Sequence, residues 1–213
     1  GAGKSTIAGL ITGVIKPRKG SLFVGDLPYA DMNLTTLRES IGYVTQENVI
    51  FTDTLRNNIT LWDQTRGDKN IETTATFLRS VIDQSSLTEF VNGLPDGLET
   101  QLGDNGLNLS GGQRQRVCIA RELYKKINLL ILDEATSALD SISEREIQNS
   151  IESMAGGLTI VVIAHRLSTI KNADLIVVLH KGEVAESGTF EELYALEGRF
   201  RKTVDYQEIS VTH

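Results

Sequence analysis

The amino-acid sequence predicts an α/β protein in which helices cover a parallel β-sheet and a helical subdomain is inserted into the core. Short apolar segments alternate with segments of helical pattern, which is typical of chains that build parallel sheets. Two apolar segments, residues 129–132 and 158–164, are continuous rather than alternating, which indicates strands buried on both faces. Between residues 47 and 127 the strand pattern lapses and helical, polar segments take over, so we place the inserted subdomain there.

The individual elements follow from the same patterns. The predicted strands comprise residues 21–24, 41–45, 128–132, 158–164, 175–179 and 183–187. The predicted helices comprise residues 4–14, 34–40, 71–80, 87–91, 110–124, 141–154 and 190–196. Thr189 with Glu192 three residues later has the spacing of a capping box and marks the start of the last helix. After residue 202 the polar tail has no strong period, and we expect it to fray.

Composition excludes several classes of protein. The formal net charge is −7, and a surface that lies along nucleic acid needs clustered Lys and Arg, so we expect no nucleic-acid partner. The single cysteine, Cys118, excludes an intrachain disulfide and a Cys-pair metal site, and its apolar neighbours predict a buried thiol. The longest apolar runs are far shorter than the roughly 18 to 20 residues that span a bilayer, so this chain is expected not to cross one.

The first residues carry half of a phosphate-binding motif. They match the end of G-x-x-x-x-G-K-[ST] and are Gly1, Ala2, Gly3, Lys4, Ser5 and Thr6. Glycines let backbone N–H groups point at phosphate oxygens, and the following helix presents the positive end of its dipole. Lys4 would reach the β- and γ-phosphates and Ser5 would place its hydroxyl on Mg²⁺. Half a motif fits a plain Gly-rich turn before a helix equally well. The missing half leads us to expect that the loop and the first strands are truncated.

Two adjacent acids follow a buried strand. Asp133 and Glu134 come directly after the apolar residues 129–132, and ligand sites of open α/β sheets lie at such carboxyl ends of strands. Asp133 would hold the Mg²⁺ shell, and Glu134 would polarise an attacking water. Two acids that cap the next helix are the alternative, and this segment alone leaves it open.

Residues 109–116 read LSGGQRQR, and here the sequence resembles the ABC ATPases, whose signature is LSGGQ. Four further segments match motifs of that family in the expected order. Gln46 resembles the Q-loop glutamine, residues 137–140 resemble the D-loop, and His165 resembles the switch histidine. Residues 100–106, TQLGDNG, are similar to the TxVGExG segment of exporters, with Leu102 and Asp104 as departures. The resemblance covers essentially the whole chain.

The resemblance implies a fold and a set of site residues. The fold is a P-loop NTPase (RecA-like) core in residues 1–46 and 128–202, without its N-terminal strands, with a helical subdomain in 47–127 and a tail in 203–213. The implied catalytic residues are Glu134, His165 and Gln46, and the implied magnesium ligands are Ser5, Gln46 and Asp133. The implied nucleotide-binding residues are Gly1, Ala2, Gly3, Lys4, Ser5, Thr6, Ser110, Gly111, Gly112, Gln113 and Asp140. The implied activity is ATP hydrolysis, with ATP and Mg²⁺ as cofactors.

A second phosphate-binding element points to a dimer. Ser110 is a good N-cap, and the glycines after it leave backbone N–H groups for an anion, so the signature is itself an anion site. The chain has only one lysine-bearing loop for its two phosphate-binding elements, which a monomer does not explain. In the family two copies face head to tail, and each signature closes on the nucleotide held by the other copy. We therefore expect a second ATP-binding domain as partner, in a homodimer or a heterodimer.

The exporter-like segments imply a membrane partner. In such transporters a membrane domain precedes the ATPase in one polypeptide, so we expect a fused transmembrane domain and a location on the cytoplasmic face of the plasma or inner membrane. The family contacts its membrane part in the region of Phe51 and Thr54, although Phe51 is equally compatible with a core position, and Trp62 is expected to pack in the helical subdomain. Alternatives are a soluble ABC ATPase of DNA repair or translation, and a binding module without turnover.

Overall fold

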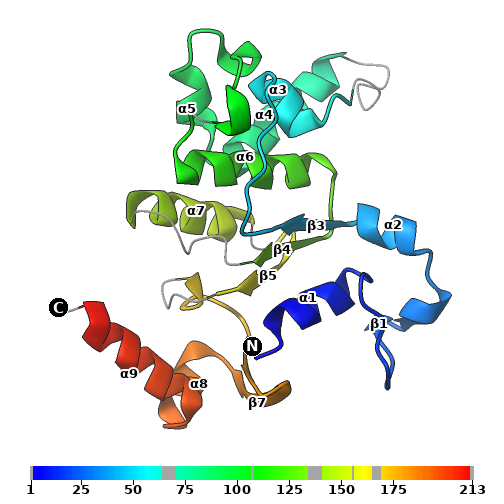
Figure 1. The fold of residues 1–213 in the computed structure, drawn as a ribbon, viewed down its shortest axis with the longest axis vertical. Helices are drawn as coiled ribbons and strands as arrows, with labels where there is room; N and C mark the ends of the chain where they lie inside the picture. Colours follow the sequence, from blue (N-terminus) through cyan, green and yellow to red (C-terminus); the bar gives the residue numbers. More distant parts are fainter. Residues whose placement is uncertain are drawn as a thin grey trace. The chain divides into compact units, whose positions relative to one another are not determined.

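The structure is a computed structural model that describes residues 2–63, 71–106, 108–133, 141–154, 156–164 and 169–211 (Figure 1). The chain divides into two compact units, of which one comprises Gly1–Leu34 with Val162–His213 and the other comprises Thr35–Val161. Each unit is described by itself. None of the helices in these ranges is long and apolar enough to cross a membrane.

The second unit holds the predicted parallel sheet. Its strands lie in the order β3 (Ile41–Val44), β4 (Leu129–Asp133) and β5 (Thr159–Ile163). β3 and β4 are parallel, with Ile41 opposite Leu129 and Val44 opposite Leu132. The three central residues of β4 are fully buried, as its continuous apolar run predicts. The same prediction is wrong for β5, whose first four residues are exposed or half-buried.

The inserted segment is helical, and the signature helix lies at its centre. After α2 (Leu34–Glu39) and β3, the elements are α3 (Leu55–Thr60), α4 (Ile71–Gln84), α5 (Thr88–Asn92), two short 3₁₀ helices (Gly97–Glu99 and Asp104–Gly106), α6 (Gly111–Tyr124) and, after β4, α7 (Ser141–Met154). α6 contacts α3 and α4 on one side and α7 and β3 on the other (Figure 1). α3 is not among the helices predicted from the sequence; Thr54 caps its N-terminus, and Leu55 and Ile59 are fully buried.

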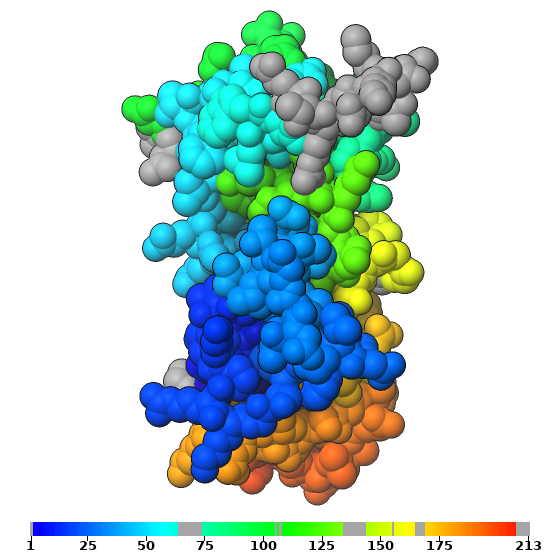
Figure 2. All heavy atoms as spheres, turned by 90° about the vertical axis from the view of Figure 1, so that its right-hand side faces the viewer, coloured from blue at the N-terminus to red at the C-terminus, as the bar shows by residue number. Residues whose placement is uncertain are grey.

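The first unit combines the two ends of the chain. Its elements are α1 (Lys4–Ile11), the hairpin of β1 (Phe23–Val24) and β2 (Leu27–Pro28), a 3₁₀ helix (Tyr29–Asp31), the antiparallel pair β6 (Ile176–His180) and β7 (Glu183–Gly188), α8 (Phe190–Ala195) and α9 (Arg199–Val211). α1 ends before the predicted residue 14, because Gly13 has a φ of 67°. The β1–β2 hairpin lies at the surface, with three exposed apolar side chains, Phe23, Val24 and Leu27 (Figure 2).

The predicted frayed tail is wrong. Residues 203–211 continue α9, because Phe200 and Val204, one turn apart, pack with Ile176 and Leu193 in a buried cluster. The helix start is held as well, since the Glu186 carboxylate accepts hydrogen bonds from the backbone N–H groups of residue 199 at 2.6 Å and of residue 200 at 3.0 Å. The domain boundaries given by the resemblance stay a prediction.

Candidate nucleotide-binding site

α1 begins directly after the glycine loop, and the backbone there needs a glycine. Gly3 has a φ of 103°, in the region that side-chain-bearing residues rarely adopt, and Lys4 begins the helix. The turn between β6 and β7 lies against this loop, because the N–H of Gly182 donates to the carbonyl of Ala2 at 3.2 Å. Lys4 is half-buried, whereas Ser5 and Thr6 are exposed on the first turn of the helix. These side chains are therefore placed at the positive end of a helix dipole.

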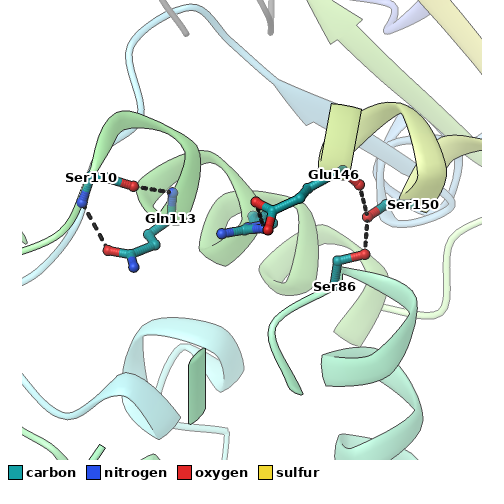
Figure 3. A network of polar contacts seen from close by, with 6 residues as sticks. Ser86, Ser110, Gln113, Glu146 and Ser150 are labelled. Atoms are coloured by element: carbon teal, nitrogen blue, oxygen red, sulfur yellow. Dashed lines mark hydrogen bonds and ion pairs between the residues drawn. The ribbon is translucent and has the colours of Figure 1, made fainter. Parts of the chain in front are cut away.

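Ser110 is the N-cap of the signature helix, as the sequence predicts, and it forms a capping box with Gln113. The hydroxyl of Ser110 accepts a hydrogen bond from the N–H of Gln113 at 3.2 Å, and the Gln113 side chain accepts one from the N–H of Ser110 at 2.9 Å (Figure 3). Ser110 is exposed, Gly111 is half-buried and Gly112 is buried. The cap fixes where α6 starts and keeps the small residues of the signature at its N-terminal end.

Asp133 is the last residue of β4, and its carboxylate has a partner on the neighbouring strand. The hydroxyl of Tyr43, on β3, donates to Oδ2 of Asp133 at 2.8 Å. The pKa of Tyr43 is raised to about 12. Burial is the largest cause, and this hydrogen bond and the negative charge of Asp133 add to it. Tyr43 is not among the site residues that the sequence predicts. No signal in the sequence identifies Tyr43, because its contact with Asp133 depends on the register in which Tyr43 pairs with Ile131.

The residues proposed as magnesium ligands carry the type of ligand atom that Mg²⁺ binds. Ser5, Gln46 and Asp133 each offer an oxygen ligand, from a hydroxyl, an amide and a carboxylate group, and Mg²⁺ prefers oxygen ligands and keeps several of its waters. The hydroxyl of Tyr43 occupies one carboxylate oxygen of Asp133, which leaves the other for a metal ion or its waters. Gln46 follows β3 and is exposed. Ser5 belongs to one compact unit, and Gln46 and Asp133 belong to the other.

Four of the residues implied by the resemblance lie outside the described ranges, namely Gly1, Glu134, Asp140 and His165. Their roles stay predictions. Of the others, residues 2–6 belong to the first unit, and Gln46, the signature residues 110–113 and Asp133 belong to the second.

A hollow of about 140 Å³ lies between α6 on one side and the end of β3 with the residues that follow it on the other. Its lining includes Tyr43, Val49, Cys118, Arg121 and Glu122. Arg121 donates to the carbonyl of Val49 at 2.9 Å and so holds the segment after β3 against α6. Cys118 is buried, which confirms the prediction of a buried thiol, and burial raises its pKa.

Phe51 is not a core residue. It is 37% exposed, stands 5.2 Å from the ring of Trp62 and lies beneath the Arg121 guanidinium at 5.1 Å. Trp62, 47% exposed, also donates a hydrogen bond to Asp53 at 2.7 Å. Trp62 therefore packs on the helical subdomain from its surface rather than from its interior.

A polar network joins α6 to its neighbours. The Arg116 side chain, 7% exposed, forms an ion pair with Glu146 of α7. The Ser150 hydroxyl donates to the Glu146 carbonyl at 2.9 Å and lies 2.6 Å from the hydroxyl of Ser86, in the turn after α4 (Figure 3). A buried guanidinium is costly to leave unpaired, so this network fixes the rotation of the signature helix against α7.

Comparison with known proteins assigns a family. The sequence profile of the family described as ABC transporter matches residues 1–137. The chain is 46% identical over 200 residues to an ATP-dependent lipid A-core flippase of Cupriavidus pinatubonensis, covering 94% of this chain and 33% of that protein. It is 43% identical over 202 residues to the heterocyst differentiation ATP-binding protein HepA of Nostoc sp., covering 95% of this chain and 32% of that protein.

The fold matches as well. A solved bacterial Atm1-family ABC exporter with ATP bound superposes with a TM-score of 0.83 at 37% identity, covering 97% of this chain and 35% of that one. The chain thus spans about one third of the length of these relatives. The matches confirm the resemblance that the signature and its companion motifs indicate, together with the P-loop NTPase fold. The chain belongs to the ABC transporter family, in which it is an ATP-binding domain.

Proposed function

We propose that this chain is the ATP-hydrolysing domain of an ABC exporter and that hydrolysis drives the export or flipping of a substrate across a membrane. One observation carries the proposal. The lysine-bearing start of α1 and the capped signature start of α6 are two helix N-termini suited to phosphate, and both fall within the family match.

The proposed chemistry is in-line attack of water on the γ-phosphoryl group. Lys4 binds the β- and γ-phosphates, and Glu134 orients the attacking water. His165 stabilises the charge that develops on the γ-phosphoryl oxygens. Ser5, Gln46 and Asp133 would hold Mg²⁺, which when bound neutralises charge on the phosphate oxygens.

The proposed assembly is a head-to-tail dimer, either of two copies or with a second ATP-binding domain. Residues 110–113 of one copy close on the nucleotide held by Lys4 of the other, and Asp140 contributes to nucleotide binding. Such an arrangement is isologous, so two nucleotides are enclosed by one pair of surfaces. ATP favours the closed dimer and hydrolysis permits reopening, which is a ligand-biased change between two states.

The proposed partner is a transmembrane domain that precedes this domain in the same polypeptide. The three relatives named above are about three times as long as this chain, and two of them are by name a flippase and an exporter. We therefore place the domain on the cytoplasmic face of a plasma or inner membrane. The same relatives disfavour the alternative of a soluble ATPase of DNA repair or translation, and the net charge of −7 gives no reason to expect a nucleic-acid partner.

The test uses the full-length protein in lipid nanodiscs and the variant Glu134→Gln. Mg²⁺-dependent phosphate release is measured for both, and dimer formation with ATP is followed by size-exclusion chromatography. The proposal expects the wild type to hydrolyse ATP and the variant to lose about three orders of magnitude in rate while it traps ATP in a stable dimer. Equal rates for the two proteins would contradict the assigned role of Glu134, and no turnover by the wild type would contradict the ATPase itself.

A further inference from the structure

Tyr43 contacts the side chain that we propose as a magnesium ligand. Its hydroxyl lies 2.8 Å from Oδ2 of Asp133, and both side chains are half-buried. The two residues come from adjacent parallel strands, where Tyr43 pairs with Ile131 and Asp133 stands two positions further along β4. The strand period places both side chains on the same side of the sheet. The contact is therefore built into the register of β3 and β4.

The backbone of Tyr43 is held in turn by the signature helix. Glu122 of α6 accepts a hydrogen bond from the N–H of Tyr43 at 3.3 Å, and Lys125 holds the same carboxylate at 2.7 and 2.8 Å. The preceding residue allows this close approach because it has no side chain. A Cβ atom at Gly42 would lie 2.9 Å from Cβ of Glu122 and 2.5 Å from Cδ1 of Ile127. A chain of contacts thus runs from α6 through Tyr43 to Asp133.

We propose that Tyr43 is a positioning residue that fixes the Asp133 carboxylate for the metal ion, with Glu122 anchoring Tyr43 to the signature helix. This proposal rests on the proposed function, because it concerns the same magnesium site. It adds to the ATPase site a hydroxyl that does not itself touch nucleotide or metal.

The physical reason lies in the freedom of a carboxylate at the end of a strand. The side chain of Asp133 can rotate about two bonds, and a metal ion selects one orientation of it. A hydrogen bond to one carboxylate oxygen restricts that rotation and leaves the second oxygen to face the ion. Hydrogen-bond partners of ligating carboxylates commonly change metal affinity by 10- to 100-fold when they are removed. The hydroxyl is neutral, so it orients the carboxylate without cancelling its charge.

The experiment compares the full-length wild type with Tyr43→Phe, which removes a single oxygen atom. Mn²⁺ is the metal probe and AMP-PNP the nucleotide, so that turnover plays no part. The dissociation constant of Mn²⁺ is measured by electron paramagnetic resonance at saturating AMP-PNP. We expect about tenfold weaker Mn²⁺ binding in the variant. The affinity for AMP-PNP in EDTA is expected to stay unchanged, since the hydroxyl acts through the metal ligand alone.

Tyr194→Phe is the matched control. It removes the hydroxyl that lies 3.5 Å from the Asp205 carboxylate, between α8 and α9, and is expected to leave Mn²⁺ binding unchanged. Unchanged or tighter Mn²⁺ binding by Tyr43→Phe would overturn the proposal, as would a Tyr43→Phe protein that fails to fold, because the contact would then be structural. A wild type with no Mn²⁺-dependent AMP-PNP binding would instead overturn the proposed function, and this proposal with it.

Discussion

At the scale of single residues, α6 and α8 both begin with a capping box, and only α6 carries the signature. Ser110 and Gln113 form a capping box at the start of α6, and Thr189 and Glu192 form another at the start of α8, with distances of 2.9 and 3.3 Å. Each box satisfies two backbone N–H groups that the helix leaves without an internal partner. The pair therefore allows the stabilising role of a cap to be separated from a role in nucleotide binding.

Ser110→Ala and Thr189→Ala are expected to be alike in stability and unlike in activity. Each loses its cap, so each lowers the free energy of unfolding by about 1 kcal/mol, measured by urea denaturation. Only Ser110→Ala is expected to slow ATP hydrolysis, by at least tenfold, because only that hydroxyl faces the nucleotide in the proposed dimer. Equal hydrolysis rates for the two variants would mean that Ser110 acts in the site only as a helix cap.

The sequence identifies candidate site residues where a motif names the chemistry, and it misses residues whose contacts depend on strand register. Asp133 is predicted as a magnesium ligand from the apolar strand before it together with the family motifs, because ligand sites of open α/β sheets lie at the carboxyl ends of strands. Tyr43 cannot be assigned in this way. Its role depends on which strand pairs with β3 and in what register, and neither follows from the periodicity of one segment.

At the scale of elements, α9 is stabilised by one hydrogen-bond acceptor at its start and by one apolar face, although most of its residues are polar. Phe200 and Val204 bury one face, and the Glu186 carboxylate on β7 accepts the first two N–H groups of the helix. These two backbone hydrogen bonds are the main reason why the pKa of Glu186 lies below its ordinary value. Glu186 therefore links the start of α9 to the sheet in a way that depends on pH.

The stabilisation by Glu186 is expected to fade in acid. Because its pKa is lowered in the folded state, the ionised form stabilises the fold above the unfolded-state pKa of about 4.3, and this contribution is lost as the pH falls through the lower folded-state pKa. Wild type and Glu186→Gln are compared by hydrogen exchange of the α9 amides. We expect the wild type to be better protected at pH 7 and the difference between the two proteins to be smaller at pH 3, below the unfolded-state pKa. A difference that is the same at both pH values would contradict this role of the carboxylate.

The elements that the sequence predicts are those with strong local signals. α7 is predicted to the residue, and α6 and β4 to within one residue, because their apolar residues recur with a clear period or in an unbroken run. α3 is missed because six residues show less than two turns of any period, and its burial comes from tertiary contact with α6. α9 is missed because its buried residues stand among charged ones, and the cluster that buries them is assembled from β6 and α8.

At the scale of the whole molecule, the two compact units carry different parts of the proposed site. The unit of Gly1–Leu34 and Val162–His213 carries Lys4 and Ser5, and the unit of Thr35–Val161 carries Ser110 and Asp133. The central claim is that Lys4 and Ser110 meet across two copies of the chain. A site shared in this way needs both residues intact, although not in the same copy.

The most direct test measures ATP hydrolysis by purified heterodimers of the full-length protein, in which each copy carries a different affinity tag. In one heterodimer, Lys4→Ala is in one copy and Ser110→Ala is in the other. In the matched control, both substitutions are in the same copy and the partner copy is wild type. The two assemblies contain the same substitutions in different arrangements, so an effect of mere destabilisation is the same in both.

The shared site predicts activity in the first heterodimer, because one of its two sites combines an unaltered Lys4 with an unaltered Ser110. It also predicts that the control is nearly inactive, since each of its sites carries one substitution. Activity in the control and none in the first heterodimer would contradict the account, because each copy would then complete its own site.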